Sequence, residues 1–331
     1  MLLRSFALPL GLILGISLGT SVGHAQKQEI FTAETINAAQ MSEVKGQELN
    51  AGVLKAQVLL DREGFSPGVI DARGGENFSK AVLAYQKARD LTATGKLDEA
   101  TWQRLTENAR DAVVASYAIT AADLTGPFVK EIPKDYAKMA ELKHLGYRGP
   151  REALSEKFHM DEDLLAALNP AVSFDTEGAS ILVASVGPKP GDQPRKLAKI
   201  VIDKTEGSLE ALAADGTLIA YFPASVGSTE KPAPTGNFQV RNVAQNPTYR
   251  YNPDFKFKGQ KSKQPIEIAP GPNGPVGAVW IGLSAKTYGI HGTSSPDLVS
   301  KTASHGCIRL TNWDALALAK LVTKGTPVEM R

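Results

Sequence analysis

Apolar residues between positions 53 and 105 recur at the three- and four-residue spacing of amphipathic helices. Leu54 and Val58 mark a first helical face, Val82 and Tyr85 mark a second, and Trp102 lies on a third. Breaks that contain glycine separate the three faces, and such breaks are where short helices end. The pattern predicts three short helices that pack around a common core.

Residues 109–187 have a less regular pattern, in which Pro and Gly separate short helical stretches. Helical spacing is present around Leu154 and again around Leu164, and an apolar run at 181–186 is typical of a strand. A Pro- and Gly-rich stretch follows. We therefore expect a connector at 109–187 and a linker at 188–196.

From residue 197 onward the apolar residues are grouped as they are in strands. We expect strands in five short runs, at 200–202, 217–224, 237–240, 276–283 and 288–292. Asp215-Gly216 is expected to form the turn between the first two of them. A final helix starts at Thr311 with capping-box spacing and ends at Gly325. The predicted fold class is multidomain α+β, with a mainly-β C-terminal domain at 197–331.

The first 25 residues have the pattern of a secretory signal peptide, with Arg4, an apolar run at 7–18 and small residues before Gln26. The run is shorter than the roughly 20 residues that cross a bilayer, and no later segment reaches that length. The alternative is a buried N-terminal helix. We expect a protein exported to the periplasm or cell envelope, without a membrane span, in which residues 26–50 form a flexible lead-in.

Composition excludes a collagen-like repeat, a disulfide-stapled mini-protein and a wholly disordered chain, because 42% of the 331 residues are hydrophobic and one is Cys. The formal net charge of +2 gives no indication of a nucleic-acid partner. Basic residues do gather in one long irregular loop, and they are Arg250, Lys256, Lys258, Lys261 and Lys263. This loop is either a solvated surface excursion or a cover over a pocket that meets substrate carboxylates.

The single cysteine, Cys307, follows Ser304-His305-Gly306 and cannot form an internal disulfide. A thiol with a pKa of about 8.5 is only about 3% thiolate at pH 7, so a nucleophilic cysteine needs a base. An imidazole that lowers the thiol pKa to about 6.5 raises that share to roughly three-quarters. His305 shares a face with Cys307 in extended backbone, and His291 arrives through folding, so both are candidates for the base.

Other residues near the thiol suit a nucleophilic site. Gly306 permits close backbone approach and leaves N–H groups near Cys307 for a developing oxyanion. Gly292 allows a backbone carbonyl to accept the second ring N–H of His291 and so fix its tautomer. Arg309 shares the face of Cys307 if the strand continues, and its guanidinium suits a substrate carboxylate.

The helical segment at 51–108 resembles the small three-helix peptidoglycan-binding domain. The residues that carry the resemblance are Gly64-Phe65, Gly68, Ile70-Asp71, Gly75, Ala81-Val82, Tyr85-Gln86, Leu91, Thr94-Gly95, Leu97-Asp98 and Thr101-Trp102. Ala72 stands where the family usually has Gly, and Phe78 stands at a usual Thr. The resemblance implies a domain that binds the cell wall.

The connector is similar to the lysin-motif (LysM) glycan-binding fold. The similarity lies in Lys157-Phe158, in Leu168-Asn169-Pro170 and in the closing strand. The usual first strand of that fold, with its Gly-Asp-Ser/Thr turn, is missing from the sequence. The resemblance implies a LysM-like segment within 109–187.

Residues 197–331 closely resemble the catalytic domain of the L,D-transpeptidases (the YkuD-like domain). The signature is His291-Gly292-Thr293 followed by Ser304-His305-Gly306-Cys307-Ile308-Arg309. Further matching blocks are Pro234-Thr235-Gly236, Gly271-Pro272-Asn273, Pro275-Val276-Gly277 and Trp280-Ile281-Gly282-Leu283. Leu298-Val299-Ser300 departs from the Ser-Ile-Gly of many members, and this departure concerns the shape of one loop.

The resemblance implies that Cys307 is the nucleophile and His291 the general base and acid. The implied supporting and oxyanion residues are Gly292, Ser304, His305 and Gly306, and the implied substrate contacts are Tyr288 and Arg309. The family cuts a peptidoglycan tetrapeptide stem after its third, L-centred residue, releases the terminal D-Ala and holds the rest as a thioester. An amine of another stem then takes the acyl group, which implies a role in cell wall biogenesis and cell shape.

Several alternatives remain open from the sequence. Water as acceptor gives an L,D-carboxypeptidase, and an amine of an envelope protein gives an enzyme that attaches that protein to peptidoglycan. A different class is a non-catalytic wall-binding protein. A zinc site of His291, His305 and Cys307 is a further alternative, although we expect neither a metal nor a cofactor. The expected partners are peptidoglycan stem peptides and glycan.

Overall fold

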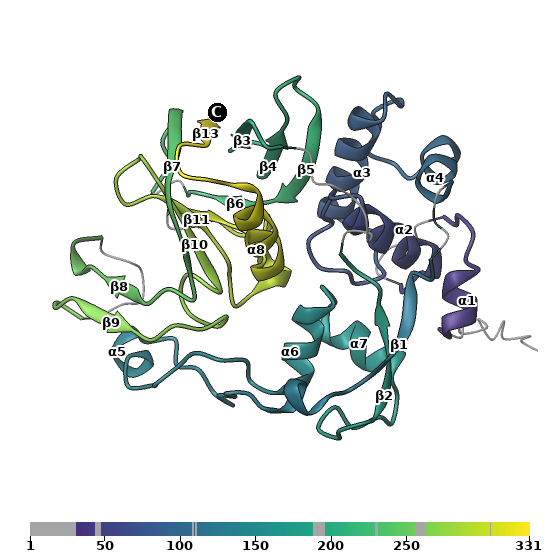
Figure 1. Ribbon diagram of the computed structural model, residues 1–331, viewed down its shortest axis with the longest axis horizontal. Coiled ribbons are helices and arrows are strands. Elements are labelled where there is room, and N and C mark those ends of the chain that lie inside the picture. Colours follow the sequence, from purple (N-terminus) through teal and green to yellow (C-terminus); the bar gives the residue numbers. More distant parts are fainter. Residues whose placement is uncertain are drawn as a thin grey trace, which may run out of the picture. The chain divides into compact units, whose positions relative to one another are not determined.

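The computed structural model describes residues 31–43, 48–107, 109, 111–187, 196–228, 231–255, 262–304 and 306–331 (Figure 1). The expected signal peptide at 1–25, most of the linker at 188–196, and the side chains of Lys256, Lys258, Lys261 and His305 lie outside these residues. None of the helices in the described ranges has the length and apolar character needed to cross a membrane.

Three helices form the first part of the chain where the hydrophobic pattern predicts them. They are α2 (Ala51–Arg62), α3 (Glu76–Ala88) and α4 (Glu99–Thr106). Asn50 and Asp98 cap α2 and α4, because each side chain accepts a first-turn backbone N–H. Leu54, Val82 and Tyr85 are buried together in the core, as the three faces predicted.

The lead-in expected to be flexible is ordered over part of its length, and that expectation was wrong there. Residues Ala33–Asn37 form the short helix α1, which Thr32 and Thr35 close with a capping box. Ile36 is completely buried in the core of the first part. The Asn37 side chain accepts the N–H groups of Val113 and Val114, so α1 is fixed at both its apolar and its polar face.

The connector contains a strand that the sequence analysis did not find. Strand β1 (Val114–Ala118) pairs antiparallel with β2 (Ser180–Ala184), and α6 (Pro150–Lys157) and α7 (Glu162–Leu168) lie between them in sequence. The connector therefore does have a strand that precedes its helices and pairs with its closing strand, whereas the sequence was expected to lack one. It was missed because about thirty residues separate it from α6, where the resemblance predicts a short turn.

Those intervening residues pack against the C-terminal domain. They include a 3₁₀ turn at Ala121–Leu124 and the single-turn helix α5 (Tyr136–Met139), which contacts β9. Met139 and Leu145 share a small apolar cluster with Ile268 of β9. The connector is thereby held against the C-terminal domain, and Figure 1 shows α5 beside β9.

The C-terminal domain is built on a nine-stranded sheet of order β5-β4-β3-β13-β7-β10-β11-β12-β6. Its strands are β3 (Lys199–Asp203), β4 (Ser208–Leu212), β5 (Leu218–Pro223), β6 (Ser225–Val226), β7 (Gly236–Gln245), β10 (Val279–Leu283), β11 (Gly289–His291), β12 (Ile308–Arg309) and β13 (Pro327–Met330). Helix α8 (Asn312–Leu321) packs on β10 and β11. The multidomain α+β class with a mainly-β C-terminal domain is confirmed.

Several strands were not expected. β4 lies between the two strands that Asp215-Gly216 was expected to join, so that turn instead connects β4 with β5. The loop at 246–276 contains a separate hairpin, β8 (Tyr249–Tyr251) with β9 (Ile266–Ile268). The final helix ends at Leu321, before the expected end at Gly325. Val322, which follows it directly, has extended backbone.

The helical first part of the chain, the connector and the C-terminal domain meet at the start of α8. Ser66 of the first part donates a hydrogen bond to Asp314 of α8, with 2.9 Å between the oxygens. His159, which follows α6, lies with Nδ1 2.8 Å from Asp61 Oδ2 of α2. We call Asp61, Glu156, His159 and Asp314 the buried junction. Each of its members joins parts of the chain that are distant in sequence.

The buried junction favours protonated side chains. Burial raises the pKa of Glu156 to about 8 and that of Asp314 to about 7. Burial opposes the charge on His159, but Asp61, Asp314 and Glu156 outweigh it and raise its pKa. All three folded-state pKa values therefore lie above those of the unfolded chain.

We expect the protein to lose stability as the pH rises through about 7 to 8. The folded state binds more protons than the unfolded state there, so the stabilisation is complete below the unfolded pKa values and is lost as the pH passes the folded ones. At about 1.4 kcal/mol per pKa unit, the expected loss between about pH 6.5 and 9 is on the order of 3 kcal/mol. Calorimetric unfolding across this range measures it. Glu156→Gln, which does not titrate, should flatten the profile, and a wild-type profile without a slope would contradict the prediction.

Candidate active site

Two adjacent parallel strands bring the predicted nucleophile and base together. In the register of β11 and β12, Ile290 pairs with Ile308 and His291 pairs with Arg309. Cys307 directly precedes β12. Because alternate side chains point to one face and paired side chains share it, His291, Arg309 and Cys307 lie on the same face of this strand pair. The imidazole and the thiol are one pairing step apart on strands about 4.8 Å from each other.

His291 is held in one orientation. Its side chain is buried, and Nδ1 lies 2.7 Å from the carbonyl oxygen of Gly292. Since a carbonyl only accepts, Nδ1 carries the proton of the neutral ring and Nε2 is left as the acceptor. Trp280, the partner of His291 on β10, stacks on the imidazole with ring centroids 5.7 Å apart. The tautomer and the plane of the ring are therefore both fixed.

The charges of the pair differ from the sequence expectation of a thiolate favoured at neutral pH. Burial, with a smaller effect of the Arg309 cation, lowers the pKa of His291 to about 4, although the hydrogen bond to the Gly292 carbonyl acts in the opposite direction. Burial raises the pKa of Cys307, although the N–H of Gly289 and the cations of Arg309 and Lys231 favour its thiolate. The imidazole and the thiol are therefore both neutral at pH 7.

The thiol lies beside the backbone of the segment that precedes β11. Cys307 is partly buried, and its Sγ lies 3.8 Å from the carbonyl oxygen of Thr287. Thr287 has a φ of +71°, a conformation that is strained for a β-branched residue. Strain of this kind is typical of segments whose geometry is dictated by a site.

Ser304 fixes the turn that leads to the thiol. It is buried, and its Oγ donates to the carbonyl of Cys307 and accepts the N–H groups of Gly227 and Gly306 at 2.7 and 3.3 Å. Gly306 has a φ of +109°, which a residue with a side chain rarely adopts. Its N–H is bound to Ser304 in this structure, so the role expected for it at an oxyanion remains a prediction. His305, the residue between them, lies outside the described part of the chain.

The two expected substrate contacts lie close to the thiol. Tyr288 packs its ring against Gly306 and donates its hydroxyl to the Pro232 carbonyl at 3.4 Å. Arg309 is partly buried, which lowers its pKa, and Tyr136 of α5 lies within its electrostatic reach. No carboxylate among the described residues forms an ion pair with Arg309. Arg309 is therefore available for an acidic group of a ligand.

Sequence reasoning did not assign roles to Trp280 or Asn312, and both frame the histidine. A β-carbon at Gly289 would lie 2.4 Å from the Trp280 ring, and one at Gly292 would lie 2.1 Å from Asn312 Oδ1. The two glycines are required because these side chains occupy the space beside them. The pairing of β10 with β11 is the signal that would have identified Trp280.

The loop that departs from the family pattern keeps its shape through hydrogen bonds. Ser300 has a φ of +65°, where the usual Gly would be unstrained. Its N–H donates to Ser225 Oγ at 3.0 Å, and Asn77 of α3 donates to the Val299 carbonyl at 3.0 Å. The peptidoglycan-binding part thus supports the loop that precedes Cys307.

Within the described ranges, no three His, Cys, Asp or Glu side chains are grouped so that they could hold a metal ion. His305, the third member of the zinc set considered from the sequence, lies outside those ranges.

Two family models match the chain. The model of the L,D-transpeptidase catalytic domain (YkuD) matches residues 198–330, and that of a peptidoglycan-binding domain matches residues 50–105. The chain is 30% identical over 177 residues to a Bacillus subtilis protein named L,D-transpeptidase YkuD, which covers 53% of this chain and 90% of that protein. It is 25% identical over 230 residues to L,D-transpeptidase YbiS of Escherichia coli, which covers 65% of this chain and 71% of that protein.

Two solved structures are also similar to part of the chain. One is L,D-transpeptidase 3 from Mycobacterium tuberculosis with a faropenem-derived adduct, at 15% identity, a TM-score of 0.34, and coverage of 48% of this chain and 76% of that one. Another is the NMR structure of the Enterococcus faecium L,D-transpeptidase catalytic domain, at 24% identity, a TM-score of 0.32, and coverage of 43% and 100%. Since most of the length of YkuD is matched at 30% identity, this chain belongs to the L,D-transpeptidase family of enzymes, which act on peptidoglycan, and carries an additional peptidoglycan-binding domain.

Proposed function

We propose that this enzyme is a cysteine L,D-transpeptidase that cross-links the third residues of two peptidoglycan stems. The observation that carries the proposal is the shared face of His291 and Cys307 on β11 and β12, with Nδ1 of the imidazole bound to the Gly292 carbonyl. This arrangement leaves Nε2 as the acceptor for the thiol proton.

Acylation proceeds with one proton transfer in each direction. Cys307 Sγ attacks the L-centred carbonyl before the terminal D-Ala while His291 Nε2 takes the thiol proton. The C–N bond then breaks, the imidazolium gives its proton to the leaving amine, and D-Ala departs. The carbonyl carbon remains on sulfur as a thioester.

Deacylation reverses the direction of proton transfer. The amine of a second stem attacks the thioester, His291 accepts a proton from it, and Cys307 leaves as the thiol after taking that proton back. The second product is the cross-linked dimer. Ser304 and Gly306 shape the turn at the thiol, and the Tyr288 ring packs against Gly306.

Two other acceptors use the same residues. Water would make the enzyme an L,D-carboxypeptidase, and an amine of an envelope protein would attach that protein to the wall. Incubation of the full chain with a disaccharide-tetrapeptide distinguishes cross-linking of stems from hydrolysis by water. We expect cross-linked dimer together with free D-Ala, whereas tripeptide without dimer would overturn the transpeptidase proposal in favour of hydrolysis.

Arg309 is proposed to bind the carboxylate of the donor stem. We expect Arg309→Met to raise KM for the tetrapeptide about 10- to 100-fold, because a hydrogen bond to a charged group contributes about 1.5–3 kcal/mol. Steady-state kinetics measure the change. Arg241→Met, at an exposed position of β7, is the matched control and should leave KM unaltered. An Arg309→Met enzyme with the wild-type KM would exclude this role.

We propose the location of the enzyme from its two matched domains and from its first 25 residues. Domains that act on peptidoglycan place it in the cell envelope, and we propose that residues 1–25 direct its export. Attachment to the polymer through residues 50–105 raises the local concentration of stems at the catalytic domain.

A further inference from the structure

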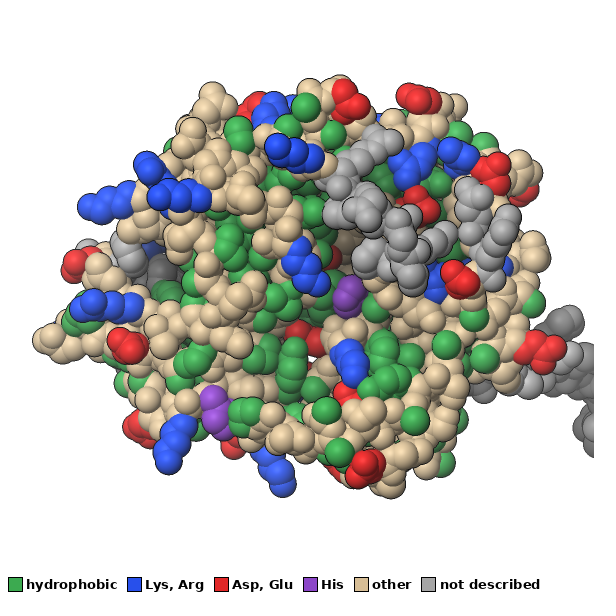
Figure 2. Space-filling view, in the orientation of Figure 1, with side chains coloured by type: hydrophobic (Ala, Val, Ile, Leu, Met, Phe, Trp, Pro, Cys, Tyr) green, Lys and Arg blue, Asp and Glu red, His purple; other side chains and the backbone are tan. Residues whose placement is uncertain are grey.

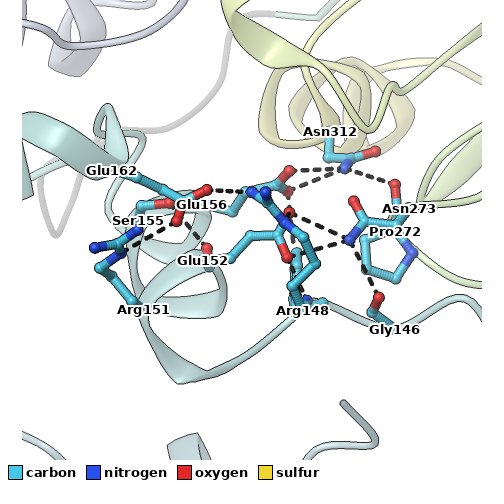
Figure 3. A network of polar contacts seen from close by, with 11 residues as sticks. Gly146, Arg148, Arg151, Glu152, Ser155, Glu156, Glu162, Pro272, Asn273 and Asn312 are labelled. Carbon is cyan, nitrogen blue, oxygen red and sulfur yellow. Dashed lines mark hydrogen bonds and ion pairs between the residues drawn. The ribbon is translucent and has the colours of Figure 1, made fainter. Parts of the chain in front are cut away.

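Asn312, the first residue of α8, lies at the centre of a polar network that joins the LysM-like segment to the catalytic domain (Figure 3). Its side chain is 1% exposed. Nδ2 donates to both carboxyl oxygens of Glu156, at 3.0 and 3.1 Å, and to the Pro272 carbonyl at 3.1 Å. Oδ1 accepts the N–H of Ala278 at 2.9 Å. The two ends of the amide therefore have different partners: Nδ2 faces hydrogen-bond acceptors and Oδ1 faces a donor.

The oxygen side of this amide touches the backbone that holds the catalytic histidine. A β-carbon at Gly292 would lie 2.1 Å from Asn312 Oδ1, so the amide oxygen is in contact with the α-carbon of Gly292. The carbonyl of the same Gly292 is the partner of His291 Nδ1, at 2.7 Å. A shift of the Asn312 amide would therefore move Gly292, whose carbonyl fixes the orientation of the imidazole.

Glu156 comes from α6, outside the residues that match the catalytic domain. It is 7% exposed and also accepts a hydrogen bond from the Tyr147 hydroxyl at 3.2 Å. One turn earlier on the same helix, Glu152 accepts from Asn273 Nδ2 at 3.2 Å. Helix α6 thus presents two carboxyl groups to two asparagines of the catalytic domain, and Figure 3 shows both pairs side by side.

We propose that Glu156 is a positioning residue for His291 and acts through the amide of Asn312. Its oxygens hold the NH₂ group of Asn312 on the α6 side, which leaves Oδ1 toward Ala278 and Gly292. Without an acceptor at position 156, the NH₂ group keeps the Pro272 carbonyl as a partner but loses both carboxyl contacts, so the amide is held less firmly in this orientation. A reversed amide would direct its NH₂ group at the Ala278 N–H and displace Gly292. The inference rests on the proposed function, in which His291 is the base for Cys307.

An isosteric pair of variants tests the role of Glu156. Burial raises the pKa of Glu156 to about 8, so the neutral acid predominates at pH 7, and Glu156→Gln reproduces its shape and an acceptor oxygen. Glu156→Met fills a similar volume without an acceptor, and apolar replacement of buried polar groups often preserves folding. Glu162 of α7 has a partly exposed carboxylate that pairs with Arg148 and Arg151. Glu162→Met therefore provides the matched control.

The measurement is the rate of alkylation of Cys307, the single cysteine, by iodoacetamide across the pH range, together with kcat and KM for the tetrapeptide. For Glu156→Met we expect alkylation at pH 7 and kcat to fall about tenfold, the equivalent of one pKa unit, with KM within about twofold. Glu156→Gln and Glu162→Met should stay within about threefold of wild type. Circular dichroism and thermal unfolding accompany each variant.

The outcomes separate this inference from the proposed function. A folded Glu156→Met enzyme with wild-type alkylation and kcat would overturn the positioning role and leave the Cys307–His291 pair intact. Equal losses in Glu156→Gln and Glu156→Met would also overturn it, because the acceptor oxygen would then be irrelevant; if Glu156→Met does not fold, a loss in Glu156→Gln overturns the proposal and wild-type behaviour supports it. If wild-type alkylation is insensitive to His291→Gln, the pair itself is wrong and the inference fails with it.

Discussion

Replacing Cys307 with serine is expected to abolish thioester formation and to lower turnover on the order of 10³-fold or more. A hydroxyl is far less acidic than a thiol, and burial of this position further disfavours an anion, as the raised pKa of Cys307 indicates. An imidazole with a pKa of about 4 is too weak a base to compensate. Serine differs from cysteine in one atom, and Cys307 Sγ is only partly buried beside the Thr287 carbonyl, so the fold should persist.

Turnover of the tetrapeptide and the thermal unfolding midpoint, measured together, check this expectation. The variant should unfold within a few degrees of wild type while release of D-Ala becomes undetectable. A Cys307→Ser or Cys307→Ala enzyme that still produced dimer would support the remaining alternative of a non-catalytic wall-binding protein.

Replacing His291 with glutamine is expected to lower kcat by about 10²- to 10⁴-fold, the usual contribution of a positioned general base. Glutamine retains hydrogen-bonding groups near the Gly292 carbonyl but cannot carry a proton between thiol and leaving amine. Because His291 is buried and stacked on Trp280, the variant also loses packing, and unfolding curves should accompany the kinetics.

The pH dependence of the wild-type enzyme gives the same residue a second test. His291 acts as a base only when neutral, and burial lowers its pKa to about 4. The rate of acylation should therefore hold as the pH falls to about 5 and decline as it passes about 4. A decline centred near 6.5, the ordinary pKa of histidine, would contradict the buried neutral pair and favour a thiolate–imidazolium pair.

Local sequence signals predicted the elements whose stability is local. Helices α2, α3 and α4 follow from apolar spacing and from the glycine-containing breaks that separate them. The site was predicted by motif, since His291-Gly292 and Ser304 to Cys307 lie in short stretches of sequence. Strands β4 and β13 were missed because their pairing partners are set by the sheet as a whole.

The contacts that surround the histidine could not be predicted for a related reason. Glu156 and Asn312 are 156 residues apart, and nothing in either segment indicates that the other lies beside it. The electrostatics of the pair also depend on burial, which turned an expected ion pair into a neutral one. On the face visible in Figure 2, acidic and basic side chains are interspersed.

One departure from a family pattern can be explained in physical terms. Ala72, at a position where the peptidoglycan-binding family usually has Gly, adopts a φ of +59°. The left-handed conformation disfavours a β-carbon by about 1–2 kcal/mol. The conformation is retained because Gln57 accepts the N–H of Ala72 at 2.8 Å and the side chain of Ala72 is buried.

The most direct test of the account is the intact mass of the full chain after acid quenching of a reaction with disaccharide-tetrapeptide, followed by mapping of the modified peptide. We expect an adduct whose mass is that of the donor stem without its terminal D-Ala. This adduct should be attached to Cys307 and should be lost when an amine acceptor is added. An unmodified chain that nonetheless forms dimer, or an adduct on any other residue, would contradict it.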